Sequence, residues 1–177
     1  RRRPDSPQPR AAPPDVYLGL GTTLQPERHL QLAHRELAAR FDLRAVSSVY
    51  RNAAIGFDGE DFLNAVACVH TGKPAEQVAA ELEEIHDLAG RRRGADAFVS
   101  RTLDIDLLLY GDDVIEALHL PRGDVLEYSF VLRPLAEMAP DLVHPVTGRC
   151  LSEHWADFDQ ASHRLVAEPG ILLNGGR

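Results

Sequence analysis

The chain has 177 residues, of which 44% are hydrophobic and 26% are charged, and this predicts one globular domain with a buried core. A net charge of −8 argues against a general nucleic-acid or anionic-membrane surface, so a bound anion would need a local basic cluster or a metal ion. Two cysteines are too few for a disulfide framework or a zinc finger, and no apolar run approaches the roughly 20 residues of a membrane span. We therefore expect a cytoplasmic protein that lies outside membranes.

Residues 1–14 and the G-G-R end at 175–177 are expected to lie outside the folded domain. Residues 1–14, R-R-R-P-D-S-P-Q-P-R-A-A-P-P, are rich in proline and arginine, which predicts a disordered tail. No apolar stretch follows the arginines, so this tail does not have the pattern of a signal peptide. We expect a single domain over residues 15–160 and a C-terminal extension over residues 161–177.

The predicted elements alternate between strands and helices. In chain order they are a strand over 16–21, a helix over 26–41, a strand over 43–50, a loop over 51–61, a strand over 62–71, a helix from Pro74 to about Leu88, a loop over 91–100 and a strand over 103–110. A later segment, 131–138, is expected to be helical after Pro134. The order strand, helix, strand, strand, helix, strand is that of a ferredoxin-like α+β sandwich, with helices on one face of an antiparallel sheet.

Two aspartates lie in the strongest predicted strand, within R-T-L-D-I-D-L-L-L-Y-G at 101–111. Because side chains alternate along a strand, Asp104 and Asp106 share one face, with Cα atoms roughly 6.5–7 Å apart. Two adjacent carboxylates repel each other and resist desolvation, so positive charge is needed beside them. Two sources stay open: a pair of Mg²⁺ ions completed by substrate phosphates, or structural ion pairs with arginines. The opposite face is assigned to the core, with Leu103, Ile105, Leu107 and Leu109.

Arginines precede this strand. Arg91 and Arg93 lie at the start of the loop, and Arg101 stands three residues before Asp104. Arginine binds phosphate oxygens bidentately, although a basic run after a helix is equally compatible with a solvent-exposed end. Lys73, the only lysine, is followed by proline, which excludes the Gly-Lys-Ser/Thr pattern of a P-loop.

The strand over 62–71 begins with D-F-L-N. Phe62 and Asn64 share a face, and together they offer a flat ring beside an amide that both donates and accepts hydrogen bonds. Such a pair suits a planar heterocycle with amide-like edges. A phenylalanine on a strand is more often part of the core, so the pair alone does not decide between these roles.

Several motifs in order resemble one family across about residues 16–155. They are S-S-V-Y-R at 47–51, D-F-L-N-A-V at 61–66, G-R-x-R at 90–93, R-T-L-D-I-D-L-L-L-Y-G at 101–111 and F-V-L-x-P-L at 130–135. The chain resembles the 6-hydroxymethyl-7,8-dihydropterin pyrophosphokinases of folate biosynthesis. The resemblance implies a ferredoxin-like fold and transfer of the terminal pyrophosphate of ATP to the hydroxymethyl group of the pterin, releasing AMP.

The resemblance also implies roles for particular residues. It assigns two Mg²⁺ ions to Asp104 and Asp106. It assigns the pterin to the rings of Phe62 and Phe130, the amide of Asn64, and Asn52 and Ile55 of the first pterin loop. It assigns the ATP phosphates to Arg91, Arg93, Arg101 and Arg122, with Arg122 standing where the family has a histidine.

Departures from the family pattern fall mainly on the nucleotide side. Gly-Thr-Thr at 21–23 replaces Gly-Ser-Asn, Phe98 replaces a tryptophan, and a Gln and a Glu of the helix before the loop appear as Glu83 and His86. Two alternatives to the pterin enzyme therefore stay open. One is a diverged paralogue acting on another heterocyclic alcohol or phosphate donor, and the other is a non-catalytic pterin-binding homologue.

Overall fold

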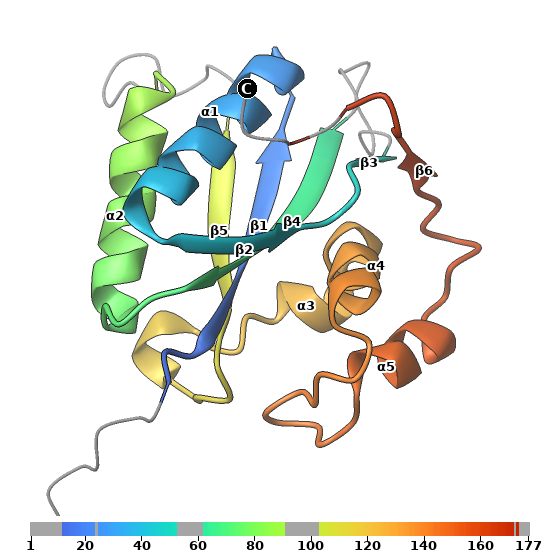
Figure 1. Cartoon of the computed structure of the whole chain (residues 1–177). Coiled ribbons are helices and arrows are strands. Elements are labelled where there is room, and N and C mark those ends of the chain that lie inside the picture. Colours follow the sequence, from blue (N-terminus) through green and yellow to red (C-terminus); the bar gives the residue numbers. More distant parts are fainter. Residues whose placement is uncertain (1–11, 24, 53–61, 91–102, 172, 174–177) are drawn as a thin grey trace, which may run out of the picture.

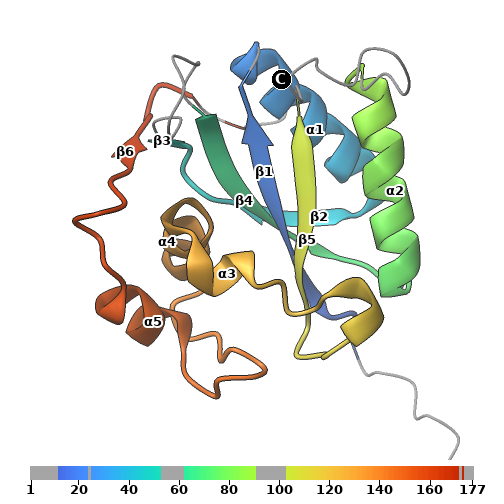
Figure 2. The ribbon, with the colours of Figure 1, turned by 180° about the vertical axis from the view of Figure 1, so that it is seen from behind.

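A single antiparallel sheet organises the protein, seen here in a computed structural model that describes residues 12–23, 25–52, 62–90, 103–171 and 173. The strand order is β5-β1-β4-β3-β6, and β2 also pairs with β4. The four central strands therefore follow the predicted ferredoxin-like order, with β2 and β3 sharing the place beside β4 (Figures 1 and 2). The strands are β1 Asp15–Thr22, β2 Asp42–Val46, β3 Tyr50–Asn52, β4 Phe62–His70, β5 Asp104–Tyr110 and β6 Val166–Ala167.

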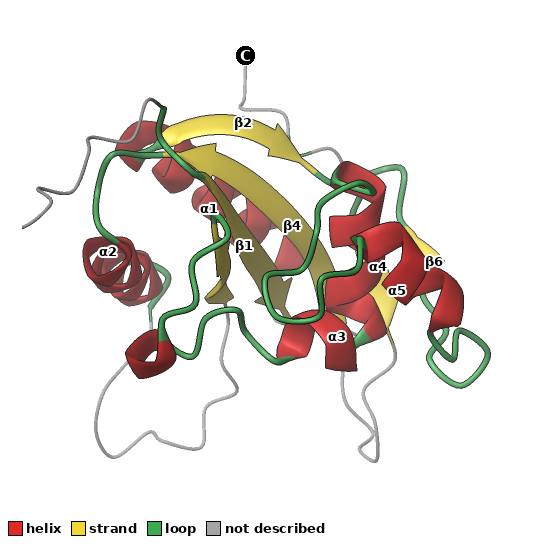
Figure 3. Ribbon diagram, turned by 90° about the horizontal axis from the view of Figure 1, so that it is seen from below, coloured by secondary structure: helices red, strands yellow, loops and turns green. Residues whose placement is uncertain are grey.

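Helices cover both faces of this sheet, as Figure 3 shows from below. On one face lie α1 (Pro26–Arg40) and α2 (Ala75–Leu88); on the other lie α3 (Asp124–Glu127), α4 (Ser129–Met138) and α5 (Leu151–Asp157), while a short 3₁₀ turn spans Glu116–Leu118. The ferredoxin-like fold is confirmed, but the expectation that helices occupy one face is wrong. The second face is itself apolar, and leaving it in water would cost the free energy that burial under α4 and α5 provides.

The alternation of side chains along β1 explains why the protein has two cores, one on each face of the sheet. Val16, Leu18 and Leu20 pack against α1 and α2, whereas Tyr17 lies in the core beneath α4. In α1, buried apolar residues recur every three or four positions, which is one face of a helix. Pro26 at its first turn loses no hydrogen bond, since the first N–H groups of a helix have no partner within it.

A β-bulge corrects the predicted core face of β5. Tyr17 pairs with Leu109 but Leu18 pairs with Leu107, so Leu108 is an extra residue in the ladder. As a result Leu108 and Leu109 both pack in the core beneath α4. The assignment of Leu109 to the same core as Ile105 is therefore wrong.

Three element boundaries also differ from the prediction. The expected strand over 43–50 is split into β2 and β3, because Ser47 turns its hydroxyl to the ladder and its Oγ accepts the N–H of Val66 at 2.8 Å. Residues 51 and 52, expected in a loop, belong to β3. Helix α4 begins at Ser129, with Pro134 inside it, rather than after Pro134.

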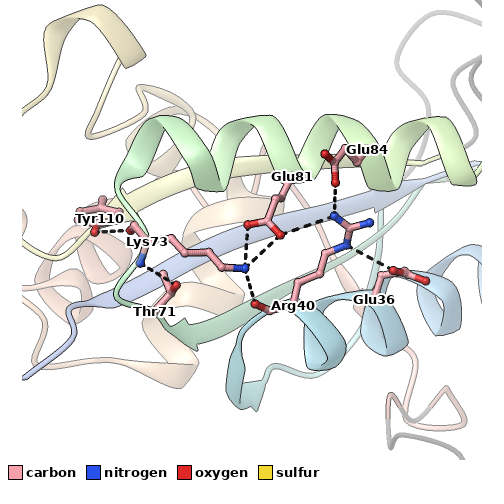
Figure 4. A network of polar contacts seen from close by, with 7 residues as sticks. All are labelled: Glu36, Arg40, Thr71, Lys73, Glu81, Glu84 and Tyr110. Atoms are coloured by element: carbon pink, nitrogen blue, oxygen red, sulfur yellow. Dashed lines mark hydrogen bonds and ion pairs between the residues drawn. The ribbon is translucent and has the colours of Figure 1, made fainter.

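A charged network joins α1 to α2, beginning at the end of the sheet where β5 finishes and extending along both helices (Figure 4). Lys73 Nζ donates to the carbonyl of Arg40 at 2.8 Å and lies 2.9 Å from a carboxylate oxygen of Glu81. Arg40 in turn donates to Glu84 at 2.5 Å, and the Tyr110 hydroxyl donates to the carbonyl of Lys73 at 2.8 Å. Lys73 thus has a structural role. Among the described residues, none of the helices is both long and apolar enough to cross a membrane.

Candidate active site

Strand β5 brings the two predicted acids to one sheet face. Asp104 and Asp106 flank Ile105, whose side chain packs in the opposite core, so both carboxylates emerge on the face that α3 and α4 partly cover. The Asp106 side chain is 42% exposed, and its Oδ1 lies 3.7 Å from Nη2 of Arg122. Arg122 contacts Asp124 more closely, at 3.1 Å between Nε and Oδ2.

The electrostatics of this pair favour an added cation. Burial raises the pKa of Asp106 above its ordinary value; Arg122 opposes this shift, whereas the negative charges of Asp104 and Asp124 add to it. The partial pairing with Arg122 therefore does not compensate the charge of Asp106. The arrangement supports the expectation of a cation site more than that of a closed structural ion pair.

Gly21 keeps the sheet face open beside the acids, whereas at Gly19 the side chain of Leu108 fills the space, 3.4 Å from where a Cβ would lie. In the ladder Asp104 stands opposite Gly21, and Asp106 stands opposite Gly19. On the other side of β1, Gly21 pairs with Asn64. Among the described residues, a Cβ at Gly21 would come within 4 Å of one atom alone, Oδ1 of Asn64 at 3.4 Å. The row from Asp104 to Asn64 spans two strand spacings, about 10 Å, and its centre carries no side chain.

The G-L-G segment at 19–21 is one of the motifs of the family resemblance, but neither glycine was predicted as a site residue, because Gly21 ends the predicted strand. The signal was available: G-L-G places both glycines on one face of β1, between an apolar position on either side. A strand that alternates glycine with buried leucine is weakened on one face, which is typical of a place where a ligand approaches the backbone closely.

Strands β3 and β4 bring together three of the predicted pterin-binding residues. Asn64 is buried, and its Nδ2 donates to Oδ1 of Asn52. Phe62 pairs with Asn52 across the ladder, shares the face of Asn64, and is 40% exposed. The hydrogen-bonded amides of Asn52 and Asn64 therefore lie beside an exposed ring at the start of β4.

The second predicted aromatic residue, Phe130, lies on α4. Its ring stacks on Tyr128 with centroids 5.0 Å apart and an interplanar angle of 18°. Phe130 is partly buried against the core that α4 shares with β4 and β5. Tyr128 was not predicted to support this ring.

His86, one of the departures from the family pattern, lies on α2 and supports the backbone of β5. His86 is 4% exposed, and its Nε2 accepts the N–H of Ile105 at 2.8 Å. Its Nδ1 lies 3.3 Å from a carboxylate oxygen of Glu83. Since Ile105 stands between the two acids, His86 fixes the backbone that carries them. The family pattern groups His86 with the nucleotide side and does not predict its hydrogen bond to Ile105.

Four predicted residues, Ile55, Arg91, Arg93 and Arg101, lie outside the described residues. Within the described part of the chain, no three side chains of His, Cys, Asp or Glu converge as a complete metal site. Asp104 and Asp106 supply only carboxylate oxygens, which are the ligands that Mg²⁺ prefers, and Mg²⁺ commonly takes its remaining ligands from water and substrate phosphates. The residues present thus fit Mg²⁺ held jointly by the two acids and a phosphate substrate.

Comparison with known proteins decides the family. The family model described as 7,8-dihydro-6-hydroxymethylpterin-pyrophosphokinase (HPPK) matches residues 17–140. The chain belongs to this family. It is 34% identical over 157 residues to 2-amino-4-hydroxy-6-hydroxymethyldihydropteridine pyrophosphokinase of Haemophilus influenzae, with 85% of this chain and 96% of that protein covered. The Pseudomonas aeruginosa protein of the same name is 37% identical over 147 residues, covering 78% of this chain and 88% of that protein. The expected class of enzyme, a pyrophosphokinase, is thereby confirmed.

Some longer proteins match this chain over part of their own length. The chain is 35% identical over 145 residues to folic acid synthesis protein fol1 of Pneumocystis carinii, covering 79% of this chain but spanning only 20% of that protein. Among solved structures, Plasmodium falciparum HPPK-DHPS matches with a TM-score of 0.64 at 11% identity, covering 83% of this chain and 44% of that chain. An HPPK-DHPS described as in complex with substrates matches with a TM-score of 0.66 at 10% identity, covering 85% and 44%. At these identities the structural likeness concerns the fold.

Proposed function

We propose that this chain transfers pyrophosphate from ATP to the hydroxymethyl group of 6-hydroxymethyl-7,8-dihydropterin, releasing AMP. The observation that carries the proposal is the row Asp104, Gly21, Asn64 across three strands. In this row the carboxylate of Asp104, one of the two proposed for Mg²⁺, and the amide of Asn64, proposed for a pterin edge, are two strand spacings or about 10 Å apart, with Gly21 between them, which supports the proposal. Family membership and the two full-length pyrophosphokinase relatives support the same reaction.

In the proposed reaction the substrate hydroxyl oxygen forms a bond to the β-phosphorus of ATP. The bond between that phosphorus and the oxygen bridging to the α-phosphate breaks, the hydroxyl proton is released, and AMP leaves. Such a transfer depends on positioning and charge neutralisation more than on a protein nucleophile. Mg²⁺, proposed as two ions, would supply Lewis-acid polarisation and charge neutralisation when bound.

The proposal assigns the remaining residues by chemistry. Asp104 and Asp106 would hold Mg²⁺, and Arg122, 3.7 Å from Asp106, is placed to contact phosphate oxygens beside it. Phe62 and Phe130 would stack on the pterin, while Asn64, held by Asn52, would hydrogen-bond its edge. Arg91, Arg93 and Arg101 are proposed as phosphate ligands, and Ile55 as a pterin contact.

A cytoplasmic setting belongs to the same proposal. The thiols of Cys68 and Cys150 are both free. Free thiols are typical of proteins in reducing compartments, which supports this assignment.

The test is AMP release from ATP, measured by chromatography with hydroxymethyldihydropterin and Mg²⁺ present. We expect AMP only when all three are supplied, and a loss of about 100-fold or more for Asp104→Asn and for Asp106→Asn. Asp112→Asn, an exposed aspartate in the turn after β5, is the matched control and should keep full activity. Absence of AMP at saturating substrates would reject the proposal, and pterin binding without binding of an ATP analogue would indicate the diverged paralogue.

A further inference from the structure

The chain beyond the matched family region returns to the sheet. Residues 166–171 and 173, here called the C-terminal strap, follow β3 and then pass toward α1 (Figure 1). Tyr50 pairs with Ala167 and Arg51 pairs with Val166. The N–H of Glu168 donates to the carbonyl of Val49 at 2.9 Å. The strap is therefore hydrogen-bonded along the outer side of β3.

The far end of the strap is anchored in the core. Leu173 is 8% exposed and belongs to the core beneath α1 and α2, and Ile171 packs against the same cluster. Gly170 and Ile171 line a cavity together with Glu27, Arg28 and Gln31 of α1. Burial of these apolar side chains holds the strap on the protein independently of its contacts with β3.

One ion pair connects the strap to the side chains of β3. Arg51 Nε lies 2.6 Å from Oε1 of Glu168, and the two side chains are 40% and 28% exposed. Arg51 is the neighbour of Asn52, the residue whose Oδ1 accepts the amide hydrogen of Asn64. The ion pair and the backbone pairing together fix the strand that ends in Asn52.

Strand β3 needs this support, because it has only three residues. Its inner side pairs with β4 at Asn64, Leu63 and Phe62. Without the strap its outer side would be a free edge, and such a short edge strand frays readily. Any displacement of Asn52 would also release the amide of Asn64, since the hydrogen bond between them orients both groups.

We propose that the C-terminal strap is a positioning element for the pterin, and that Glu168 is its positioning residue. The inference rests on the proposed function, because it takes Asn64 and Asn52 as the groups that face the pterin. It goes beyond that function by assigning a role to residues after 140, the end of the match to the family. The strap holds β3 at the pterin end of the site, whereas the carboxylates lie on β5, with β1 and β4 between these strands.

The experiment uses the full chain with substitutions at Glu168. Glu168→Ala removes the ion pair and keeps the backbone donor, while Glu168→Pro also removes the N–H that bonds Val49. The dissociation constant of 6-hydroxymethylpterin is measured by calorimetry with Mg²⁺ and a non-hydrolysable ATP analogue present, and the constant of the analogue is measured separately. We expect pterin binding to weaken about two- to fivefold for Glu168→Ala and about tenfold or more for Glu168→Pro, with analogue binding unchanged.

The matched control is Asp157→Ala at the end of α5, which removes an exposed ion pair of 2.7 Å to Arg149. It should leave both dissociation constants unchanged. Unchanged pterin binding in Glu168→Pro would overturn the inference, and so would an equal loss of pterin and analogue binding, which would indicate general destabilisation. Failure of the unsubstituted protein to bind pterin would instead reject the proposed function, so the two outcomes are distinguishable.

Discussion

Replacing His86 tests whether the backbone between the two acids must be held from behind. His86 Nε2 accepts the N–H of Ile105 at 2.8 Å in a site where the histidine is 4% exposed. Leucine at this position fills the buried site with an apolar side chain but offers no hydrogen-bond acceptor. A buried N–H left without a partner costs about 1–3 kcal/mol, and in a chain of this length each kcal/mol lowers Tm by about 2–4 °C. We therefore expect His86→Leu to lower Tm by about 2–12 °C.

The same substitution should act on the metal site. Ile105 lies between Asp104 and Asp106, so a displaced backbone at this residue moves both carboxylates. We expect His86→Leu to require more Mg²⁺ for half-maximal AMP release, with little change in the KM for the pterin. His86→Gln is the matched control, since Oε1 of glutamine has about the reach of Nε2 and restores the acceptor.

The assays are thermal unfolding followed by circular dichroism, and AMP release across a Mg²⁺ series. The reasoning would be refuted if His86→Leu matched the unsubstituted protein in both Tm and Mg²⁺ dependence. It would also be refuted if the glutamine variant were impaired as strongly as the leucine variant, because the acceptor would then be irrelevant.

Three further predictions concern protonation. The folded state raises the pKa of Asp106, mainly by burial, so ionisation of this carboxyl group lowers stability as pH rises through the ordinary carboxyl range. Asp106→Asn should therefore raise the Tm of the ligand-free protein more at pH 7.5 than at pH 4, while AMP release is lost. An equal change in Tm at the two pH values would contradict this. Burial lowers the pKa of His144, whose Nδ1 accepts two backbone N–H groups. The stability of the protein should therefore fall as pH drops below about 6.5, and it should fall less steeply in His144→Asn. Thermal scans from pH 7.5 to pH 5 test this. Burial raises the pKa of Cys68 to about 11, so a thiol reagent at pH 8 should label Cys150 first, and rapid labelling that persists in Cys150→Ser would refute this.

The fold was predictable wherever local periodicity determined it. The helical spacing of Leu30, Ala33 and Leu37 and the alternation along β1 are properties of short segments, and they located the first strand and helix to within a residue or two. The bulge at Leu108 was not predictable in this way, since it depends on the register between β1 and β5. The position of the helices over the second face was not predictable either, because it depends on which face of the sheet a segment distant in the sequence covers.

The candidate site shows the same division. Asp104 and Asp106 share a face because alternation operates over two residues, so the sequence predicted their relation without knowledge of the fold. The contacts of His86 with Ile105 and of Asn52 with Asn64 join residues 19 and 12 positions apart, and they exist only once α2 packs on β5 and β3 pairs with β4. Residue types could nominate these side chains, but tertiary packing gave them their partners.

The network of Lys73, Arg40 and Glu81 is joined to Tyr110 at the end of β5 through the carbonyl of Lys73, and Tyr110 lies roughly 20 Å along the strand from Asp104 (Figure 4). The Lys73 end of this network is thus remote from the carboxylates. We expect substitutions that strengthen the contacts of Lys73 to raise heat tolerance without altering turnover. Contacts that join the two helices and groups proposed for the chemistry can therefore be changed separately at the two ends of β5.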